Sequence, residues 1–375
     1  MLALHRTHLG AWLAFAPLAT TAASAQQRAP EVVPTVPAVA WHAPGRSMEV
    51  RRPLACSKGR VFRGGDTLEA LDVHTGERAV AAKAAGPWLE PVLGGGFVFA
   101  RHRDGSVHAF VPNLDRELWQ VPLAPSWFPG STCGDIFLVA SGTEVVAITA
   151  GGVHWRTDLG ESIEMTPAAD GKRVFVGTAA GRVVALDLHT GAVAWERDVG
   201  GELGHSDPVV DRDTLFVADR GQREGRRGSL NALSAATGEL LWQTSFGATG
   251  FSTPFPCEDE VWAGFGTTVV RFDRATGRLD RDRRICAGRN PFGRPAVAGD
   301  AVVFGNLDGS LYVHDRASGA RRWRFEVGKD AQVGSWCLHE GVLVVSTTVG
   351  LFGLVASTAK PEADFVLRAE VTNTK

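Results

Sequence analysis

The sequence predicts an all-β fold of eight four-stranded antiparallel units arranged in a ring, an eight-bladed β-propeller. Three markers recur in phase along the 375 residues: a proline that opens each unit, a D-x-x-T-G turn, and a tryptophan shortly after that turn. A fixed period of about 40 residues is the signature of a repeat architecture. Four short strands fit this period, and radial repetition leaves only short edges exposed. An open solenoid, the alternative, usually has one strand or helix pair per unit.

The opening prolines set the period. They are Pro53, Pro91, Pro129, Pro167, Pro208, Pro254 and Pro295, and Trp336 holds the same register in the eighth unit. Successive positions are 38, 38, 38, 41, 46, 41 and 41 residues apart. Proline has no N–H, so it suits the first residue of a strand, where no ladder hydrogen bond is lost. Each unit is therefore expected to begin with an inner strand at this position.

The turn and the tryptophan mark the other end of each unit. The turn reads LDVHTG (71–76), LDLHTG (186–191), LSAATG (233–238), FDRATG (272–277) and HDRASG (314–319). Its glycine supplies a positive φ, and its aspartate accepts backbone N–H bonds. Outer-strand tryptophans follow at Trp195, Trp242 and Trp323, with Trp119 and Trp155 at the matching place in degenerate units. Side chains of this size are expected to wedge between neighbouring sheets. Runs such as VFVGT (174–178) predict the strands in between.

The ring is expected to close through the N-terminal end of the chain. The eighth unit has no T-G-x-x-x-W after its third strand. Trp41 lies 12 residues before Pro53, the interval found in two other units, so residues 36–43 look like the missing outer strand. Such a closure ties the first unit to the last and leaves neither with a bare edge. The competing candidate is the C-terminal run Phe365–Val371, which would leave Trp41 in a flap.

The turn with its tryptophan, as in LDLHTGAVAW (186–195), resembles the PQQ-like repeat, and the resemblance covers about residues 36–357. The G-H and W-D signatures of WD40 propellers are absent. Two groups share this repeat. Similarity to quinoprotein dehydrogenases would imply quinone and calcium in the central channel, an adjacent Cys-Cys disulfide and a catalytic aspartate, but this chain has no Cys-Cys pair. Length and unit count resemble the BamB-like propellers of outer-membrane β-barrel assembly, although the lipobox cysteine is missing.

The N-terminus resembles an export signal, with Arg6, the apolar run 11–19 and small residues at Ala23–Ala25. No later segment reaches the length required to span a bilayer. The expected organisation is a signal peptide (1–25), a Pro-rich, extended and mobile leader (26–38), the propeller (39–357) and a C-terminal tail with a possible extra strand (358–375). The expected location is periplasmic or secreted.

Charge and motifs exclude several functions. The chain has 39 basic and 41 acidic residues, which gives no support to nucleic-acid binding. No P-loop, G-x-S-x-G elbow or H-E-x-x-H occurs, so we predict no catalytic residue, cofactor or metal. Histidines such as His108 and His339 are expected at surface or turn positions. Asp211-x-Asp213 and Asn306-x-Asp308 loosely resemble calcium loops, but we expect them to be hairpin turns.

The five cysteines, Cys56, Cys133, Cys257, Cys286 and Cys337, allow two disulfides with one thiol left over, in fifteen arrangements. None stands in a C-x-x-C spacing. The sequence leaves the pairing open, and we expect buried free thiols for most of them.

Two groups of residues are candidates for contact with a ligand or partner. The residues immediately before the opening prolines are expected to ring one mouth of the central channel, and their charged members are Arg52, Glu90, Asp207 and Arg294. They either bind a small polar ligand or neutralise one another. The second group is a longer hairpin in the fifth unit with Arg220, Arg223, Arg226 and Arg227. It is either a solvated loop or a contact for an acidic partner or membrane surface.

Together these observations predict an exported, monomeric, non-catalytic scaffold that binds another envelope protein, with outer-membrane protein assembly as the role that the resemblance implies. Three alternatives stay open: a quinone-dependent dehydrogenase, a propeller that binds a small ligand in its channel, and a protein that binds carbohydrate or another part of the cell envelope.

Overall fold

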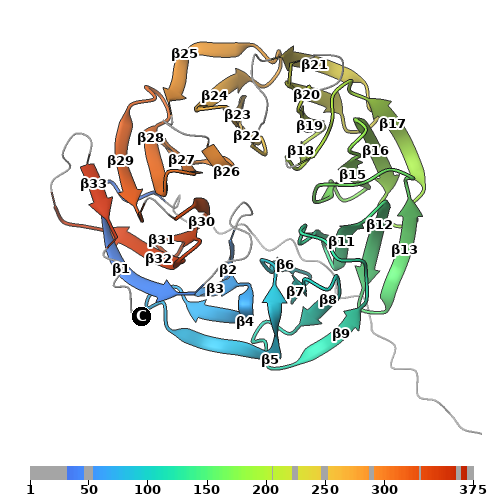
Figure 1. Cartoon of the computed structure of the whole chain (residues 1–375). Coiled ribbons are helices and arrows are strands. Elements are labelled where there is room, and N and C mark those ends of the chain that lie inside the picture. The colour runs from blue at the N-terminus through green and yellow to red at the C-terminus, as the bar shows by residue number, and fades with distance from the viewer. Residues whose placement is uncertain are drawn as a thin grey trace, which may run out of the picture. The chain divides into compact units, whose positions relative to one another are not determined.

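The computed structural model describes residues 32–45, 54–204, 206–221, 227–245, 252–286, 291–328, 331–359 and 365–369. Within these ranges the strands form eight sheets around a common centre, which confirms the eight-bladed β-propeller (Figure 1). Seven blades have four strands and the seventh in the ring has five. The predicted signal peptide lies outside the described residues.

The first four blades follow one another from the inner to the outer strand. Blade one has β2 (Ala55–Ser57), β3 (Arg60–Arg63), β4 (Gly65–Asp72) and β5 (Arg78–Trp88). Blade two has β6 (Val92–Gly94), β7 (Phe97–Arg101), β8 (Val107–Phe110) and β9 (Glu117–Val121). Blade three has β10 (Ser131–Cys133), β11 (Ile136–Ser141), β12 (Glu144–Thr149) and β13 (Gly152–Asp158). Blade four has β14 (Ala168–Ala169), β15 (Arg173–Gly177), β16 (Arg182–Asp187) and β17 (Val193–Asp198).

The last four blades continue in the same order. Blade five has β18 (Val209–Asp211), β19 (Thr214–Asp219), β20 (Ser229–Ser234) and β21 (Leu240–Ser245). Blade six has β22 (Phe255–Cys257), β23 (Glu260–Phe265), β24 (Thr268–Asp273) and β25 (Leu279–Cys286). Blade seven has β26 (Pro291–Ala298), β27 (Ala301–Asn306), β28 (Ser310–Asp315), β29 (Arg321–Glu326) and β33 (Phe365–Arg368). Blade eight has β30 (Val333–His339), β31 (Val342–Thr347), β32 (Gly350–Ala356) and β1 (Pro37–Pro44).

The core lies between neighbouring blades, where the two middle strands of each blade are covered on both faces. All six residues of β11 and of β27 are buried, which explains why these strands read as continuous apolar runs rather than alternating ones. One hydrophobic cluster joins blades three, four and five, and others join the remaining neighbours. Each blade therefore depends on its neighbours for burial of its apolar surface.

The repeated tryptophan and the repeated turn lock adjacent blades together, as predicted. The indole N–H of Trp155 in blade three donates to the carbonyl of Leu188 in the turn of blade four, at 2.8 Å. The same ring covers Gly191 of that turn, where a Cβ atom would lie 2.6 Å from the indole. Glycine is thus required twice, for its φ of +70° and for this close contact. Trp41, Trp195 and Trp242 donate in the same way to Val73, Ala235 and Arg274.

Trp119 belongs to the degenerate second unit and is held differently. It is half-buried on the outer strand β9 and packs against Phe99 of the same blade, with the ring centroids 5.8 Å apart. Its position as an outer-strand tryptophan is confirmed, and its ring joins the cluster shared by blades two and three.

Strand β1 closes the ring, as the spacing of Trp41 predicts. It pairs antiparallel with β32 from Pro37↔Ala356 to Pro44↔Gly350 and so becomes the outer strand of blade eight (Figure 1). The alternative, closure by the C-terminal run, is wrong for this blade. Strand β33 instead pairs parallel with β29 and adds a fifth strand to blade seven.

Part of the segment expected to be a mobile leader packs on the propeller. Val33 and Val36 are each only 3% exposed, and Val33 joins the core between blades seven and eight. The indole N–H of Trp323, which is fully buried, donates to the carbonyl of Pro34 at 2.8 Å. Blade eight has no D-x-x-T-G turn to receive this tryptophan, so residues 33–36 supply the acceptor. The expectation of mobility does not hold for these residues.

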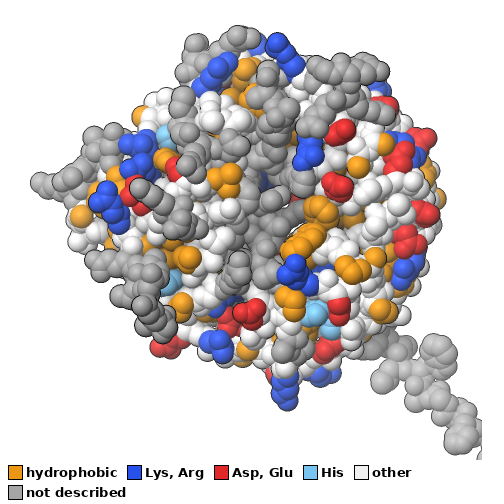
Figure 2. Space-filling view, viewed as in Figure 1, with side chains coloured by type: hydrophobic (Ala, Val, Ile, Leu, Met, Phe, Trp, Pro, Cys, Tyr) orange, Lys and Arg blue, Asp and Glu red, His pale blue; other side chains and the backbone are white. Residues whose placement is uncertain are grey.

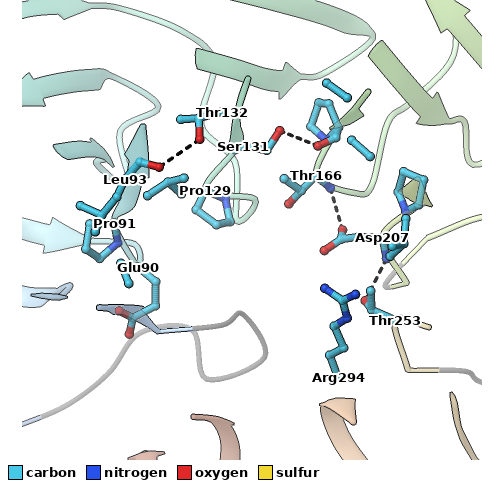
Figure 3. Close-up of a pocket in the computed structure, with 18 of the residues that line it drawn as sticks. Glu90, Pro91, Leu93, Pro129, Ser131, Thr132, Thr166, Asp207, Thr253 and Arg294 are labelled. Atoms are coloured by element: carbon cyan, nitrogen blue, oxygen red, sulfur yellow. Dashed lines mark hydrogen bonds between the residues drawn. The ribbon is translucent and has the colours of Figure 1, made fainter. Parts of the chain in front are cut away.

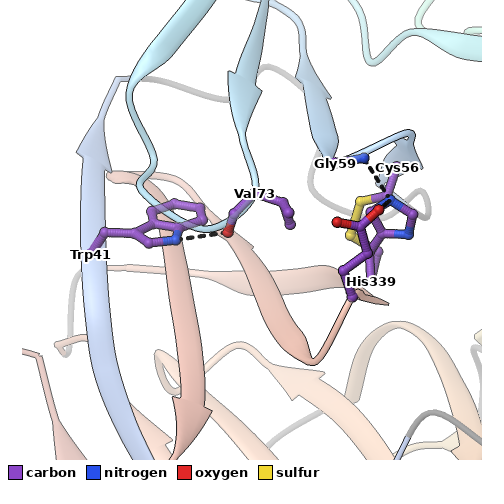
Figure 4. Close-up of a disulfide and its surroundings, with 7 residues drawn as sticks. Trp41, Cys56, Gly59, Val73 and His339 are labelled. Atoms are coloured by element: carbon purple, nitrogen blue, oxygen red, sulfur yellow. Dashed lines mark hydrogen bonds and ion pairs between the residues drawn. A yellow bond between two sulfur atoms is a disulfide. The ribbon is translucent and has the colours of Figure 1, made fainter.

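A disulfide between Cys56 and Cys337 crosses the closing interface (Figure 4). It joins the inner strands of blades one and eight, 281 residues apart in sequence, with a Cα–Cα distance of 6.7 Å. Close by, Gly59 N–H donates to His339 Nε2 at 3.1 Å. The sequence left the pairing open, and ring closure decides it for this pair by bringing the two ends together. Cys133 and Cys257 are free and half-buried, and the side chain of Cys286 lies outside the described part.

His108 is buried in blade two, contrary to the expected surface position. Its exposed fraction is 7%, its Nδ1 lies 3.0 Å from Glu117 Oε1, and its Nε2 lies 2.9 Å from Ser106 Oγ. Burial lowers the pKa of His108, although Glu117 opposes this effect. Just below about pH 6.5, His108 is therefore protonated in the unfolded chain but still neutral in the folded chain. The stability of the fold consequently decreases as the pH drops.

We expect His108→Gln to reduce this acid sensitivity. Between pH 7.5 and the mildly acidic range, the melting temperature (Tm) of the variant should fall by about 1–2 °C less than that of the parent. Thermal scans at one fixed heating rate across this range check the prediction. An equal loss in both proteins would contradict it, because the protonation of another group would then account for the loss.

Candidate functional site

A cavity of about 550 Å³ lies among the inner strands, and the residues that precede the opening prolines line it (Figure 3). Five of the eight predicted ring positions contribute: Glu90, Thr166, Asp207, Thr253 and Arg294. The register of the repeat places them together, because each stands at the same point of its unit. Arg52, the fourth charged candidate, lies outside the described residues.

The two carboxylates are held by backbone groups. Glu90 is 2% exposed and accepts a hydrogen bond from Gly64 N–H in blade one, at 3.3 Å. Asp207 Oδ1 accepts from Thr166 N–H at 2.8 Å, while Asp207 N–H donates to Thr253 Oγ1 at 3.1 Å. These contacts join blades four, five and six at their inner ends. Asp207 therefore has a structural role in addition to any contact with a ligand.

Arg294, in β26, brings a positive charge to the same cavity. Its guanidinium lies over the ring of Phe255, with Cζ 4.7 Å from the ring centroid. Burial lowers the pKa of Arg294 to about 10, although Asp211 opposes the shift, so the group is still charged at neutral pH. Its Nε has no hydrogen-bond partner among the described residues. One sequence-based alternative was that the charged ring residues neutralise one another. Arg294 forms no ion pair with a residue of the described ranges.

Thr166 and the prolines complete the lining. Thr166 is 6% exposed, and its Oγ1 has no hydrogen-bond partner within the described part of the chain. The opening prolines Pro91, Pro129, Pro167 and Pro208 form apolar walls. The sequence indicated these positions, but it missed Phe255, whose only signal is its place directly after Pro254.

The long hairpin of blade five connects β19 with β20, as predicted. Asp219 fixes its base by accepting hydrogen bonds from Ser229 N–H at 3.1 Å and Asn231 Nδ2 at 2.8 Å. Arg227 is exposed, as expected, whereas Arg220 is half-buried because it directly follows the strand. Arg223 and Arg226 lie outside the described residues.

Charge is mixed over the visible surface. On the face in Figure 2, basic and acidic side chains are interspersed around the rim, and several acidic ones gather over blades three and four. The two calcium-like loops are hairpin turns: Asp211 pairs with Arg274, and Asp308 accepts hydrogen bonds from Ser310 N–H and Tyr312 Oη–H. The described ranges contain no group of three or more His, Cys, Asp or Glu side chains placed to hold a metal. They also contain no helix long and apolar enough to cross a membrane.

The fold and the repeat define the class: an eight-bladed β-propeller built from PQQ-like repeats. The family described as "Outer membrane protein assembly factor BamB" matches residues 103–223 and 179–350, which is more than half of the chain. The chain belongs to this family.

Curated members of the family are distant relatives. The BamB of Pseudomonas aeruginosa is 30% identical over 189 residues, which is 45% of this chain and 47% of that protein. The BamB of Yersinia pestis is 26% identical over 262 residues, 64% of this chain and 57% of that protein. The chain thus matches about half the length of these relatives.

Solved structures agree on the fold. BamB from Moraxella catarrhalis superposes with a TM-score of 0.68 at 20% identity, over 84% of this chain and 98% of that one. The quinohemoprotein alcohol dehydrogenase ADHIIG from Pseudomonas putida gives 0.67 at 12% identity, over 87% of this chain and 77% of that one. At these identities the likeness is one of fold alone.

Proposed function

We propose that this protein is an exported, monomeric, non-catalytic scaffold in the periplasm that binds another envelope protein during the assembly of outer-membrane proteins. Membership of the BamB family carries the proposal, since the match extends from blade two into blade eight. The fold suits such a role, because interlocked blades hold the loops at fixed positions for docking.

The proposed contact for the partner is the hairpin of blade five, with Arg220, Arg223, Arg226 and Arg227. The base of the hairpin is fixed, and its four arginines are close together in sequence. An acidic surface on the partner is the chemistry that these groups would recognise.

The experiment is a pull-down from envelope extract with the purified parent and with a variant in which all four arginines become serine. Recovery of outer-membrane assembly components by the parent supports the proposed function, and their absence contradicts it. We expect the variant to recover roughly tenfold less partner, because the loss of four charges at a few tenths of a kcal/mol each amounts to about 1.4 kcal/mol. Its Tm should stay within about 1 °C of the parent.

A matched variant controls for the loss of four positive charges. Lys58, Lys83, Arg116 and Lys172 are exposed at other places on the propeller, and serine at all four should leave recovery unchanged. Equal recovery by all three proteins would show that the hairpin is ordinary solvated surface. Quinone-dependent dehydrogenation, the alternative, is supported by a shared fold and by a sequence match that covers only 24% of this chain, and we do not propose it.

A further inference from the structure

Two arginines of this propeller, the buried Arg101 and the half-buried Arg294, differ in what surrounds them. Arg101 is fully buried, and its guanidinium donates to three backbone carbonyls, those of Phe128, Ala140 and Ala124, at 2.8–3.0 Å. Burial lowers its pKa to about 10, as it does for Arg294. Arg101 is therefore a structural cation whose two terminal nitrogens donate within the fold, while its Nε has no hydrogen-bond partner among the described residues.

Arg294 has no such partners among the described residues. Its Nε has no hydrogen-bond partner among the described residues, and its guanidinium lies over the ring of Phe255. A half-buried cation whose Nε lacks a hydrogen-bond partner loses part of its solvation without compensation. When it faces a cavity, it is typical of a binding site.

We propose that the central cavity binds a small organic monocarboxylate on the guanidinium of Arg294. Guanidinium is planar and binds a carboxylate through two parallel N–H bonds. Phe255 covers one face of the group, which leaves the edge with its N–H donors for the anion. This proposal is separate from the scaffold function.

The other residues that line the cavity limit the chemical class of the ligand. Glu90 and Asp207 line the same cavity, so a dianion such as phosphate is disfavoured by repulsion, whereas a single negative charge is tolerated. The hydroxyl of Thr166 is a neutral donor without a partner in the described part, and it suits a carboxylate oxygen or a ligand carbonyl. The proline walls favour an apolar organic part, and about 550 Å³ is enough for a small molecule. Figure 3 shows Thr166, Asp207, Thr253 and Arg294 on one side of the cavity, with Glu90 across from them.

The binding test uses the purified full chain and ligand-observed NMR. The probes are monocarboxylates from acetate to N-acetylated amino acids, each measured beside its neutral amide, with inorganic phosphate as a further probe. We expect carboxylates but not their amides to bind, and affinity to fall at least tenfold in Arg294→Gln and less in Thr166→Val. The proposal is overturned if no carboxylate shows binding that depends on Arg294, if the amides bind equally well, or if phosphate binds best.

Stability without ligand gives a second readout. Arg294→Gln should leave the Tm within about 1 °C of the parent or raise it, since it removes a half-buried cation whose Nε has no hydrogen-bond partner among the described residues. The matched control Arg101→Gln should lower the Tm by about 5 °C or more, because it leaves buried carbonyls unpaired. A comparable fall for both variants would mean that Arg294 is structural and would overturn the proposal. Recovery of protein partners should be the same for the parent and Arg294→Gln, so the two proposals fail independently.

Discussion

Removal of residues 26–46, which contain β1, should lower the Tm of the propeller by about 10 °C or more. The deletion removes the outer strand of blade eight and the burial of Trp41, Val33 and Val36. Each fully buried apolar side chain contributes about 1.5–3 kcal/mol, and the deletion also frees the indole N–H of Trp323. Removal of residues 361–375 should cost only a few degrees, roughly 3–5 °C, because β33 makes four pairs and its apolar side chains are half-buried.

Thermal unfolding of both truncated proteins beside the parent, at one heating rate, measures the difference. Circular dichroism at low temperature shows whether each still folds. If the C-terminal truncation is the more damaging of the two, the closing role assigned to β1 is wrong, whatever the absolute values.

Loss of the Cys56–Cys337 disulfide should also have a large effect, in the range of about 2–5 kcal/mol. The bond closes a loop of 281 residues, and long loops lose the most chain entropy when they are cross-linked in the unfolded state. A Cys56→Ser/Cys337→Ser variant should have a lower Tm that reductant leaves unchanged, while reductant lowers the Tm of the parent.

The other thiols provide the control. Cys133 and Cys257 are free, so serine at both should change the Tm little and leave the response to reductant intact. A parent that keeps its Tm after its bond has demonstrably been reduced would contradict the prediction. Because β1 and the disulfide stabilise the same interface, their combined loss should be smaller than the sum of the separate losses.

The repeat made most of the fold predictable. The opening position recurs in eight units and predicts the blade count, the turn and tryptophan that follow predict the strand order, and one displaced tryptophan, Trp41, reveals the closing strand. The pairing of Cys56 with Cys337 was beyond the sequence, because it depends on the two ends of the ring meeting. The packing of Val33 and Val36 was missed because a polar, Pro-rich composition normally indicates an extended chain. These residues are buried because the segment 33–36 takes the place of the turn that blade eight lacks. This replacement can be recognised only in the folded ring.

The site was predictable in position and not in chemistry. The register placed Glu90, Asp207 and Arg294 around one cavity, since each stands immediately before the opening proline of its unit. Which charges pair depends on side-chain directions and on backbone donors such as Gly64 N–H and Thr166 N–H, which have no sequence signal. The sequence therefore left both ligand binding and mutual neutralisation open.

The closing strand also has a consequence for how this chain acquires its structure. Trp41 on β1 pairs with Gly353 on β32, more than 300 residues later. During synthesis β1 emerges first, and its partner strand is among the last to appear. Until then, the incomplete ring has two unsatisfied edges that invite wrong pairing with other chains. Contacts so distant in sequence form slowly, so ring closure is expected to be the late and rate-limiting event of folding.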